Sequence, residues 1–319
     1  MIVISNISAL EVWEALGSDD AKRTRSRIRK PTGNAHPTTD SELGFLHALG
    51  LRTPVHLAID RPGKRSASDG FIAHVHSRPV PDRTLCDMGD GVLVEAPELA
   101  YMRMLRGLSY VERQMLAMEL CGCYSTLGTG DSGGFKQREP LLTIHKLQTF
   151  LSKEHSASYA ATAVSPLRYL ADGSASPMET IVELLLCEPY RRGGYGFPIP
   201  EMNSRIDVPP DVEVWGGKPF YKCDLFWRGA RLAIEYDSNE FHSSSASLNR
   251  DAIRRNAIEH LGIRVVTLTF NQVRNQFVFH GVVPQIAKAL GKRRQLPEGF
   301  LASNTALRKA LFTPMPWQS

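Results

Sequence analysis

The stretch YKCDLFWRGARLAIEYDSNEFH, residues 221–242, decides the fold of the C-terminal half of the chain. It reads as two short strands of alternating residues joined by a tight turn. Three acids, Asp224, Glu235 and Asp237, stand inside strand patterns that are otherwise apolar. Carboxylates in a buried strand are costly unless they are paired. The three acids therefore either form a site or lie on a solvated face of the sheet.

Two registers of this hairpin are compatible with the sequence. A two-residue loop at Gly229-Ala230 places Asp224 directly opposite Glu235, and a loop one residue earlier places the two acids on a diagonal. Side chains alternate across a strand with period two, so both registers put Asp224, Glu235 and Asp237 on one face. The nearest pair is then about 5–8 Å apart.

Adjacent carboxylates in a poorly hydrated site repel each other, which raises their pKa values or destabilises the fold. A divalent cation removes this cost, and Mg²⁺ is held by one or two carboxylates together with water and phosphate oxygens. Asp224, Glu235 and Asp237 are therefore candidates to bind Mg²⁺ or Mn²⁺. The alternative is a solvated sheet face on which the acids pair with Lys222, Arg231 and Arg254.

The elements around the hairpin predict a small α/β unit. The pattern indicates a helix, a strand, the hairpin, a helix, a strand and a last long helix, at residues 177–188, 205–208, 220–237, 248–262, 263–270 and 272–290. Ser176 and Pro177 form a typical helix start, and Gly262 ends the second helix. This order predicts a mixed sheet with helices on both faces.

The arrangement resembles the PD-(D/E)xK superfamily, whose members have the restriction-endonuclease-like fold, and within it the very-short-patch-repair endonuclease branch. The resemblance covers roughly residues 175–290. It is carried by S-P-M-E (176–179), Y-x-C-D-L (221–225) and I-E-Y-D (234–237), followed by His242, Asp251 and Arg254-Arg255 ahead of L-G-I-R-V-V.

This resemblance implies DNA as the partner and metal-dependent phosphodiester hydrolysis as the activity. It implies the catalytic set Glu179, Asp224, Glu235, Asp237, His242 and Lys222, with Arg250, Arg254 and Arg255 touching nucleic acid. Asp237 stands where the superfamily places a lysine, a substitution usual in the branch with the E-x-D…H pattern. His242 would then act on the attacking water or the leaving group, and Lys222 would supply the displaced positive charge.

The N-terminal part is expected to form a smaller α+β domain over residues 1–172, ahead of a nuclease-like domain at 173–295 and a tail at 296–319. Within it, residues 55–60 and 70–77 alternate as the strands of a hairpin with a long loop. This part resembles, more weakly, antitoxins of bacterial abortive-infection type IV toxin–antitoxin systems, through VHLAID, IAHVHSRPVP and VLVEAPELAYMRML. His74 and His76 share one strand face, where a structural role is favoured over metal binding.

The composition allows these functions without requiring them. The net charge is +5 and the pI about 9.0, a mild basic excess compatible with a polyanionic partner. The five cysteines lack any zinc-binding spacing and indicate free thiols in a reducing cytoplasm. No signal peptide or membrane-spanning run of apolar residues is evident.

Two hypotheses of function follow. The first is a Mg²⁺-dependent endonuclease acting on DNA, with DNA repair or defence against phages and mobile elements as its setting. The second is a DNA-binding regulator of the antitoxin kind that keeps the nuclease fold as a scaffold. A homodimer and, for the regulator, a toxin partner are both compatible with the sequence.

Overall fold

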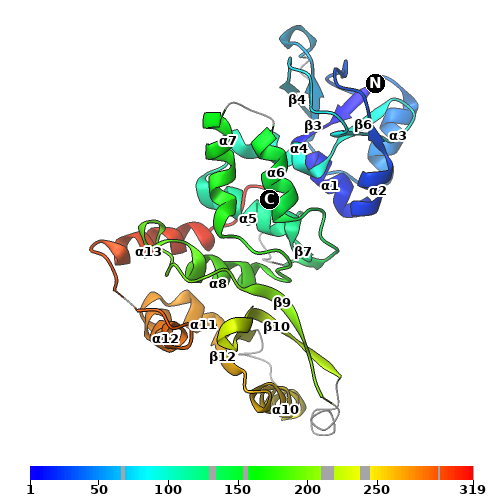
Figure 1. The fold of residues 1–319 in the computed structure, drawn as a ribbon. Coiled ribbons are helices and arrows are strands. Elements are labelled where there is room, and N and C mark those ends of the chain that lie inside the picture. Colours follow the sequence, from blue (N-terminus) through cyan, green and yellow to red (C-terminus); the bar gives the residue numbers. More distant parts are fainter. Residues whose placement is uncertain are drawn as a thin grey trace. The chain divides into compact units, whose positions relative to one another are not determined.

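The chain divides into two compact units, each described by itself. Unit 1 comprises residues 1–168 and 314–319, and unit 2 comprises residues 169–313. The computed structural model (Figure 1) describes residues 1–65, 69–128, 134–153, 157–209, 219–237, 245–293 and 295–318. Both units combine helices with β-sheet, and the chain is an α/β protein, as its sequence predicts.

Unit 1 is built around a six-stranded sheet with the strand order β2-β5-β6-β1-β3-β4. Its strands are β1 (Ile2–Ile4), β2 (Arg25–Ser26), β3 (Val55–Ile59), β4 (Phe71–Val75), β5 (Leu85–Asp87) and β6 (Val92–Glu95), with a separate ribbon of β7 (Tyr124–Ser125) and β8 (Lys136–Gln137). Its helices are α1 (Asn6–Leu16), α2 (Ser18–Arg23), α3 (Asp40–Leu49), α4 (Pro97–Met104), α5 (Tyr110–Cys121), α6 (Ile144–Lys153) and α7 (Ala157–Val164).

The pairing of β3 with β4 corrects the expected hairpin. The two strands have the expected positions, but they are parallel, with Val55 opposite Phe71 and Ile59 opposite Val75. Two parallel neighbouring strands require a crossover connection, which returns the chain to the end of the sheet where the first strand began. The long connection, which contains a 3₁₀ turn at Pro62–Lys64, makes this return, so alternation alone did not reveal the strand direction.

The last residues of the chain are part of the core of unit 1. Trp317 is 2% exposed, and its indole N–H donates to Glu119 Oε2 over 2.9 Å. The Arg52 guanidinium donates to the Trp317 carbonyl over 3.1 Å. The segment expected to be a separate tail therefore contributes a buried aromatic ring to the N-terminal unit.

Unit 2 is built around a four-stranded sheet with the order β12-β11-β10-β9. Its strands are β9 (Glu201–Asp207), β10 (Phe220–Trp227), β11 (Leu232–Asp237) and β12 (Arg264–Thr269). Its helices are α8 (Pro177–Cys187), α10 (Ser245–His260), α11 (Phe270–Arg274), α12 (Gln276–Ala289) and α13 (Phe300–Leu311). Strands β9, β10 and β11 are antiparallel and β12 runs parallel to β11, and in Figure 1 the sheet runs between α8 and α10.

The hairpin register confirms the first of the two predicted alternatives. Leu225 pairs with Ile234 and Trp227 with Leu232, so the same register continues to bring Asp224 opposite Glu235. The turn itself is longer than expected, because a 3₁₀ turn precedes Arg231, which has a φ of +48°. The predicted last helix is instead two helices, α11 and α12.

The packing of the last helix of unit 2 explains why residue 193 is a glycine. Helix α13, which lies in the segment expected to be a tail, packs against α8, and its buried Asn304 donates to the Gly193 carbonyl over 2.6 Å. A Cβ atom on Gly193 would meet the Ser303 carbonyl oxygen at 2.4 Å, so only glycine allows this approach. Within the described ranges, no helix is both long and apolar enough to cross a lipid bilayer.

Candidate metal centre

Asp224 lies where the pairing of β10 is interrupted on both sides. The paired residues of β10 and β9 pass from Cys223 directly to Leu225, and those of β10 and β11 begin only at Leu225. The Asp224 Oδ2 atom instead accepts the backbone N–H of Tyr236 over 2.7 Å. The Asp224 carboxylate thus accepts a backbone N–H that a carbonyl of the neighbouring strand would accept in a regular sheet. This contact fixes the Asp224 carboxylate in the gap between β10 and β11.

Glu235 brings a second carboxylate to the same gap from β11. Its Oε2 atom accepts a hydrogen bond from Arg254 Nη2 over 2.5 Å. Among the described residues, its buried Oε1 atom has no hydrogen-bond partner apart from the neighbouring thiol of Cys223, which is at best a weak donor. A buried carboxylate oxygen without a donor is costly, so Glu235 retains the capacity to bind a cation. The alternative of a solvated sheet face is right that Glu235 pairs with Arg254 and wrong that Glu235 is solvated, because its side chain is only 13% exposed.

Glu179 joins the group from the first turn of α8. Ser176 caps this helix by accepting the Glu179 N–H, which confirms the predicted helix start. The Glu179 carboxylate in turn accepts the N–H of Ala175 over 2.9 Å and the amide of Asn203 over 2.6 Å. Its orientation is therefore fixed by three hydrogen bonds, one of them from the Ser176 hydroxyl.

The three carboxylates share one electrostatic environment. The pKa of Glu235 is raised to about 7, first by burial and then by the charges of Asp224 and Glu179, against the opposing effect of Arg254. Burial also raises the pKa of Glu179, with Asp224 as the next cause, and burial raises the pKa of Asp224. Mutual repulsion of this kind is what the sequence predicts for closely spaced acids without a bound cation.

Positive groups border the same site. A pocket of about 520 Å³ is lined by Asn203, Pro219, Phe220, Tyr221, Lys222, Asp224 and Arg254, and it is large enough for a phosphodiester group. The Lys222 side chain is exposed. Arg255, the next residue of α10, donates to the Thr267 hydroxyl over 2.6 Å and so lies over the adjoining strand β12.

These residues fit a metal held by two carboxylates rather than by a closed cage. In the ranges that the structure describes, no three His, Cys, Asp or Glu side chains are gathered closely enough to hold a metal ion. Mg²⁺ commonly binds one or two carboxylates and completes its shell with water and phosphate oxygens, and Asp224 with Glu235 would provide that donor set.

For some residues of the predicted site, the structure describes only the backbone, only the edge of the site, or nothing. Asp237 is the last described residue of β11, opposite Thr269 of β12, and is half-buried. His242 lies outside the described residues. Arg250 lies on α10, but its side chain lies outside the described ones.

Two residues differ from what their sequence positions suggest. Glu183, four residues after Glu179, is expected to be solvated, but it is fully buried, and burial raises its pKa well above the usual value. Asn203 has no sequence signal apart from the tolerance of asparagine for positive φ. Its φ of +47° places its amide on Glu179.

Three histidines of unit 1 lie close together: His56, His74 and His76. His74 Nε2 lies 2.9 Å from His56 Nδ1, and the rings of His74 and His76 are stacked with centroids 6.4 Å apart. Burial lowers the pKa of His56 to about 4 and that of His76 to about 3. Stacked neutral rings do not converge on one ion, so the structure agrees with the structural role favoured for His74 and His76.

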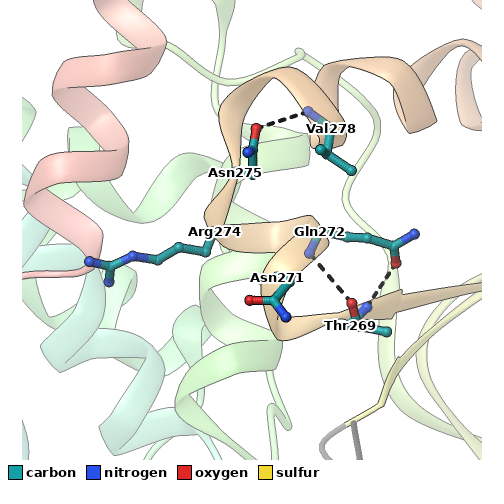
Figure 2. A pocket seen from close by; sticks show the side chains of 6 residues that line it. All are labelled: Thr269, Asn271, Gln272, Arg274, Asn275 and Val278. Carbon is teal, nitrogen blue, oxygen red and sulfur yellow. Dashed lines mark hydrogen bonds between the residues drawn. The ribbon is translucent and has the colours of Figure 1, made fainter.

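A second pocket of unit 2, shown in Figure 2, contains no acid. It is lined by Thr269, Asn271, Gln272, Arg274, Asn275 and Val278. Asn275 breaks the predicted last helix, because its Oδ1 accepts the N–H groups of Phe277 and Val278 and so starts α12. The Arg274 side chain points away toward α13 (Figure 2), with its guanidinium 4.9 Å from the centre of the Phe312 ring.

The raised pKa of Glu235 predicts a pH-dependent stability. The unfolded carboxyl titrates near 4.5 and the folded one near 7, so the folded state keeps its proton longer. Stability should therefore fall as the pH rises from about 4.5 to about 7 and then level off. Urea unfolding of metal-free protein should show this decline in the wild type and a shallower one in Glu235→Gln. Identical pH profiles for the two proteins would show that Glu235 titrates normally.

Comparison with known proteins supplies relatives but no activity. Two proteins of Mycobacterium tuberculosis, from two strains and both named only as uncharacterised, are each 30% identical to this chain over 115 residues. The match covers 36% of this chain and 38% of each relative, so the chain spans well under half the length of the relatives it matches. No family model matches the chain, and no solved structure matches it.

Proposed function

We propose that the chain is a metal-dependent endonuclease that hydrolyses phosphodiester bonds of DNA. The observation that carries this proposal is the gap between β10 and β11. Asp224 occupies it in place of a backbone hydrogen bond, and Glu235 adds a buried oxygen that has no strong donor among the described residues. Such an arrangement costs stability in the absence of a cation, and a function that needs the cation explains why the chain keeps it.

In this proposal the acidic side chains hold the metal ion and the basic side chains hold the DNA. Asp224 and Glu235 would bind Mg²⁺ or Mn²⁺, which supplies activation of water and stabilisation of charge at phosphorus. Glu179 is fixed by its hydrogen bonds, and its charge would favour a cation in the gap. Asp237 would contribute a further carboxylate from the end of β11.

The basic residues around the pocket suit the negatively charged backbone of DNA. Lys222 and Arg254 line the pocket beside Asp224, and Arg255 lies one residue further along α10. Contacts of Lys and Arg with phosphate supply most of the affinity of proteins for DNA and carry no base preference. The transfer of a proton to the leaving group or from the attacking water is assigned to His242, on the sequence resemblance alone.

One observation favours the alternative of a DNA-binding regulator with a retained nuclease fold. The charge of Glu235 is already balanced by Arg254, as it would be in a site that has lost its metal. In that case the basic residues would still bind DNA, and the acids would be structural.

A cleavage assay separates the two functions. Purified protein is incubated with supercoiled plasmid, mismatched duplex and single-stranded DNA in Mg²⁺, in Mn²⁺ or in EDTA, and DNA binding is measured in EDTA. The nuclease should nick or cut at least one substrate only when the metal is present. Binding without metal-dependent cleavage of any of the three substrates would replace the nuclease by the regulator.

A further inference from the structure

Arg254 is the cation that balances the acid site in this structure. Its Nη2 atom donates to Glu235 Oε2 over 2.5 Å and also to the Lys222 carbonyl. The Arg254 side chain is 36% exposed, whereas the Glu235 side chain is 13% exposed. A buried carboxylate is thus paired with a guanidinium that itself remains accessible from solvent.

Arg254 lies where it can pair either with Glu235 or with a phosphate bound in the pocket. It lines the pocket together with Lys222 and Asp224, where a phosphodiester group would enter. A guanidinium binds phosphate with the same donors that it presents to a carboxylate. A phosphate in this pocket would therefore compete with Glu235 for Arg254.

The same contact opposes metal binding. With Arg254 attached, Glu235 offers a cation little net charge, and a second positive ion beside the guanidinium is repelled. In the part of the chain that the structure describes, buried Glu235 Oε1 has at most the weak thiol donor of Cys223 beside it, so the carboxylate keeps a coordinating position available. Tight binding of a metal ion therefore requires that the positively charged Arg254 guanidinium moves away from Glu235.

We propose that Arg254 exchanges between Glu235 and a DNA phosphate, so that substrate binding opens the acid site for the metal. This inference rests on the proposed function. Because coupling between two ligands is reciprocal, a metal on Glu235 also releases Arg254 for phosphate. The ion pair thus weakens metal binding until DNA is bound.

Metal affinity in the absence of DNA tests the first half of the exchange. Mn²⁺ is titrated calorimetrically into wild type, Arg254→Gln and the matched control Arg255→Gln. Both variants lose one positive charge from neighbouring positions of α10, but only Arg254 contacts Glu235. Arg254→Gln should bind Mn²⁺ about 5- to 150-fold more tightly than wild type, the usual range of coupling between sites, and Arg255→Gln should change the affinity much less.

DNA affinity in EDTA, where no cleavage interferes, tests the second half. Glu235→Gln should release Arg254 and tighten binding of a short duplex about two- to fivefold, the scale of a partly exposed ion pair. Glu179→Gln, which removes a neighbouring carboxylate that does not pair with Arg254, should tighten it less. If Arg254→Gln does not fold, Arg254→Lys keeps the charge but loses the planar fork, and it should bind Mn²⁺ more tightly than wild type by a smaller factor.

The outcomes separate this inference from the proposed function. If wild type binds Mn²⁺ and neither Arg254 variant binds it more tightly, the exchange is wrong and the nuclease remains. Equal tightening of DNA binding by Glu235→Gln and Glu179→Gln also overturns the exchange, because it would be an effect of charge alone. If no protein in the series binds Mn²⁺, both the exchange and the metal-dependent nuclease are wrong.

Discussion

Glu235→Gln is expected to lower the rate of metal-dependent DNA cleavage about 10²–10⁴-fold without reducing DNA affinity. The amide keeps the shape of the side chain but removes the charge that balances the cation, whose stabilisation of the transition state is worth several kcal/mol. DNA affinity comes from phosphate contacts of basic residues, which the substitution leaves in place. Single-turnover cleavage rates and anisotropy titrations in EDTA measure the two quantities.

The control for this variant is Glu201→Gln. Glu201 is an exposed acid of β9 that pairs with Arg228 over 2.6 Å and has no part in the proposed site. Its substitution should leave the cleavage rate within about twofold of wild type, the scale of an exposed ion pair. Equal rates for wild type and Glu235→Gln would remove Glu235 from the catalytic group.

Trp317→Ala is expected to destabilise unit 1 by about 3–5 kcal/mol, the usual cost of removing a buried aromatic ring. The substitution also removes the indole donor that serves the buried Glu119 carboxylate. Hydrogen exchange of the amides of β1 and β6, which lie at the centre of the unit 1 sheet, should report the loss.

Trp317→Phe separates the two contributions. It keeps most of the apolar volume and loses only the N–H donor. Because Glu119 Oε2 still accepts the Thr126 hydroxyl, the cost should be about 0.5–1.5 kcal/mol, the net contribution of one hydrogen bond. Unchanged exchange in Trp317→Ala would mean that the last residues of the chain do not support unit 1.

The central hairpin was predictable because local rules govern it. Alternation with period two places Asp224 and Glu235 on one face in either register, and Ser176 with Pro177 specifies the start of α8. Helix and strand order in unit 2 followed from apolar periodicity for the same reason. The acids were visible as candidates because carboxylates interrupt an apolar pattern.

Features that depend on distant residues were not predictable in the same way. The amide of Asn203 reaches Glu179 only because β9 and α8 are packed together, and the pairing of Arg254 with Glu235 depends on how α10 lies beside β11. The parallel direction of β4 depends on the path of a long connection. The position of Trp317 depends on contacts with residues about two hundred positions earlier in the chain.

His242, a candidate for proton transfer in the proposed reaction, lies outside the described residues. Its part in the proposed reaction stays a prediction from the sequence. General acid–base help is typically worth about 10²–10⁴-fold, and the cation would remain when it is lost. His242→Ala should therefore retain metal binding, which Asp224→Asn should not.

The metal affinity of Asp224 tests the central claim most directly. Mn²⁺ is titrated into metal-free wild type and into Asp224→Asn, with heat of binding as the signal. The account predicts saturable binding by the wild type and binding at least about tenfold weaker in Asp224→Asn, because the amide lacks the charge that offsets dehydration of the ion. Equal binding by the two proteins, or no binding by the wild type, would contradict it.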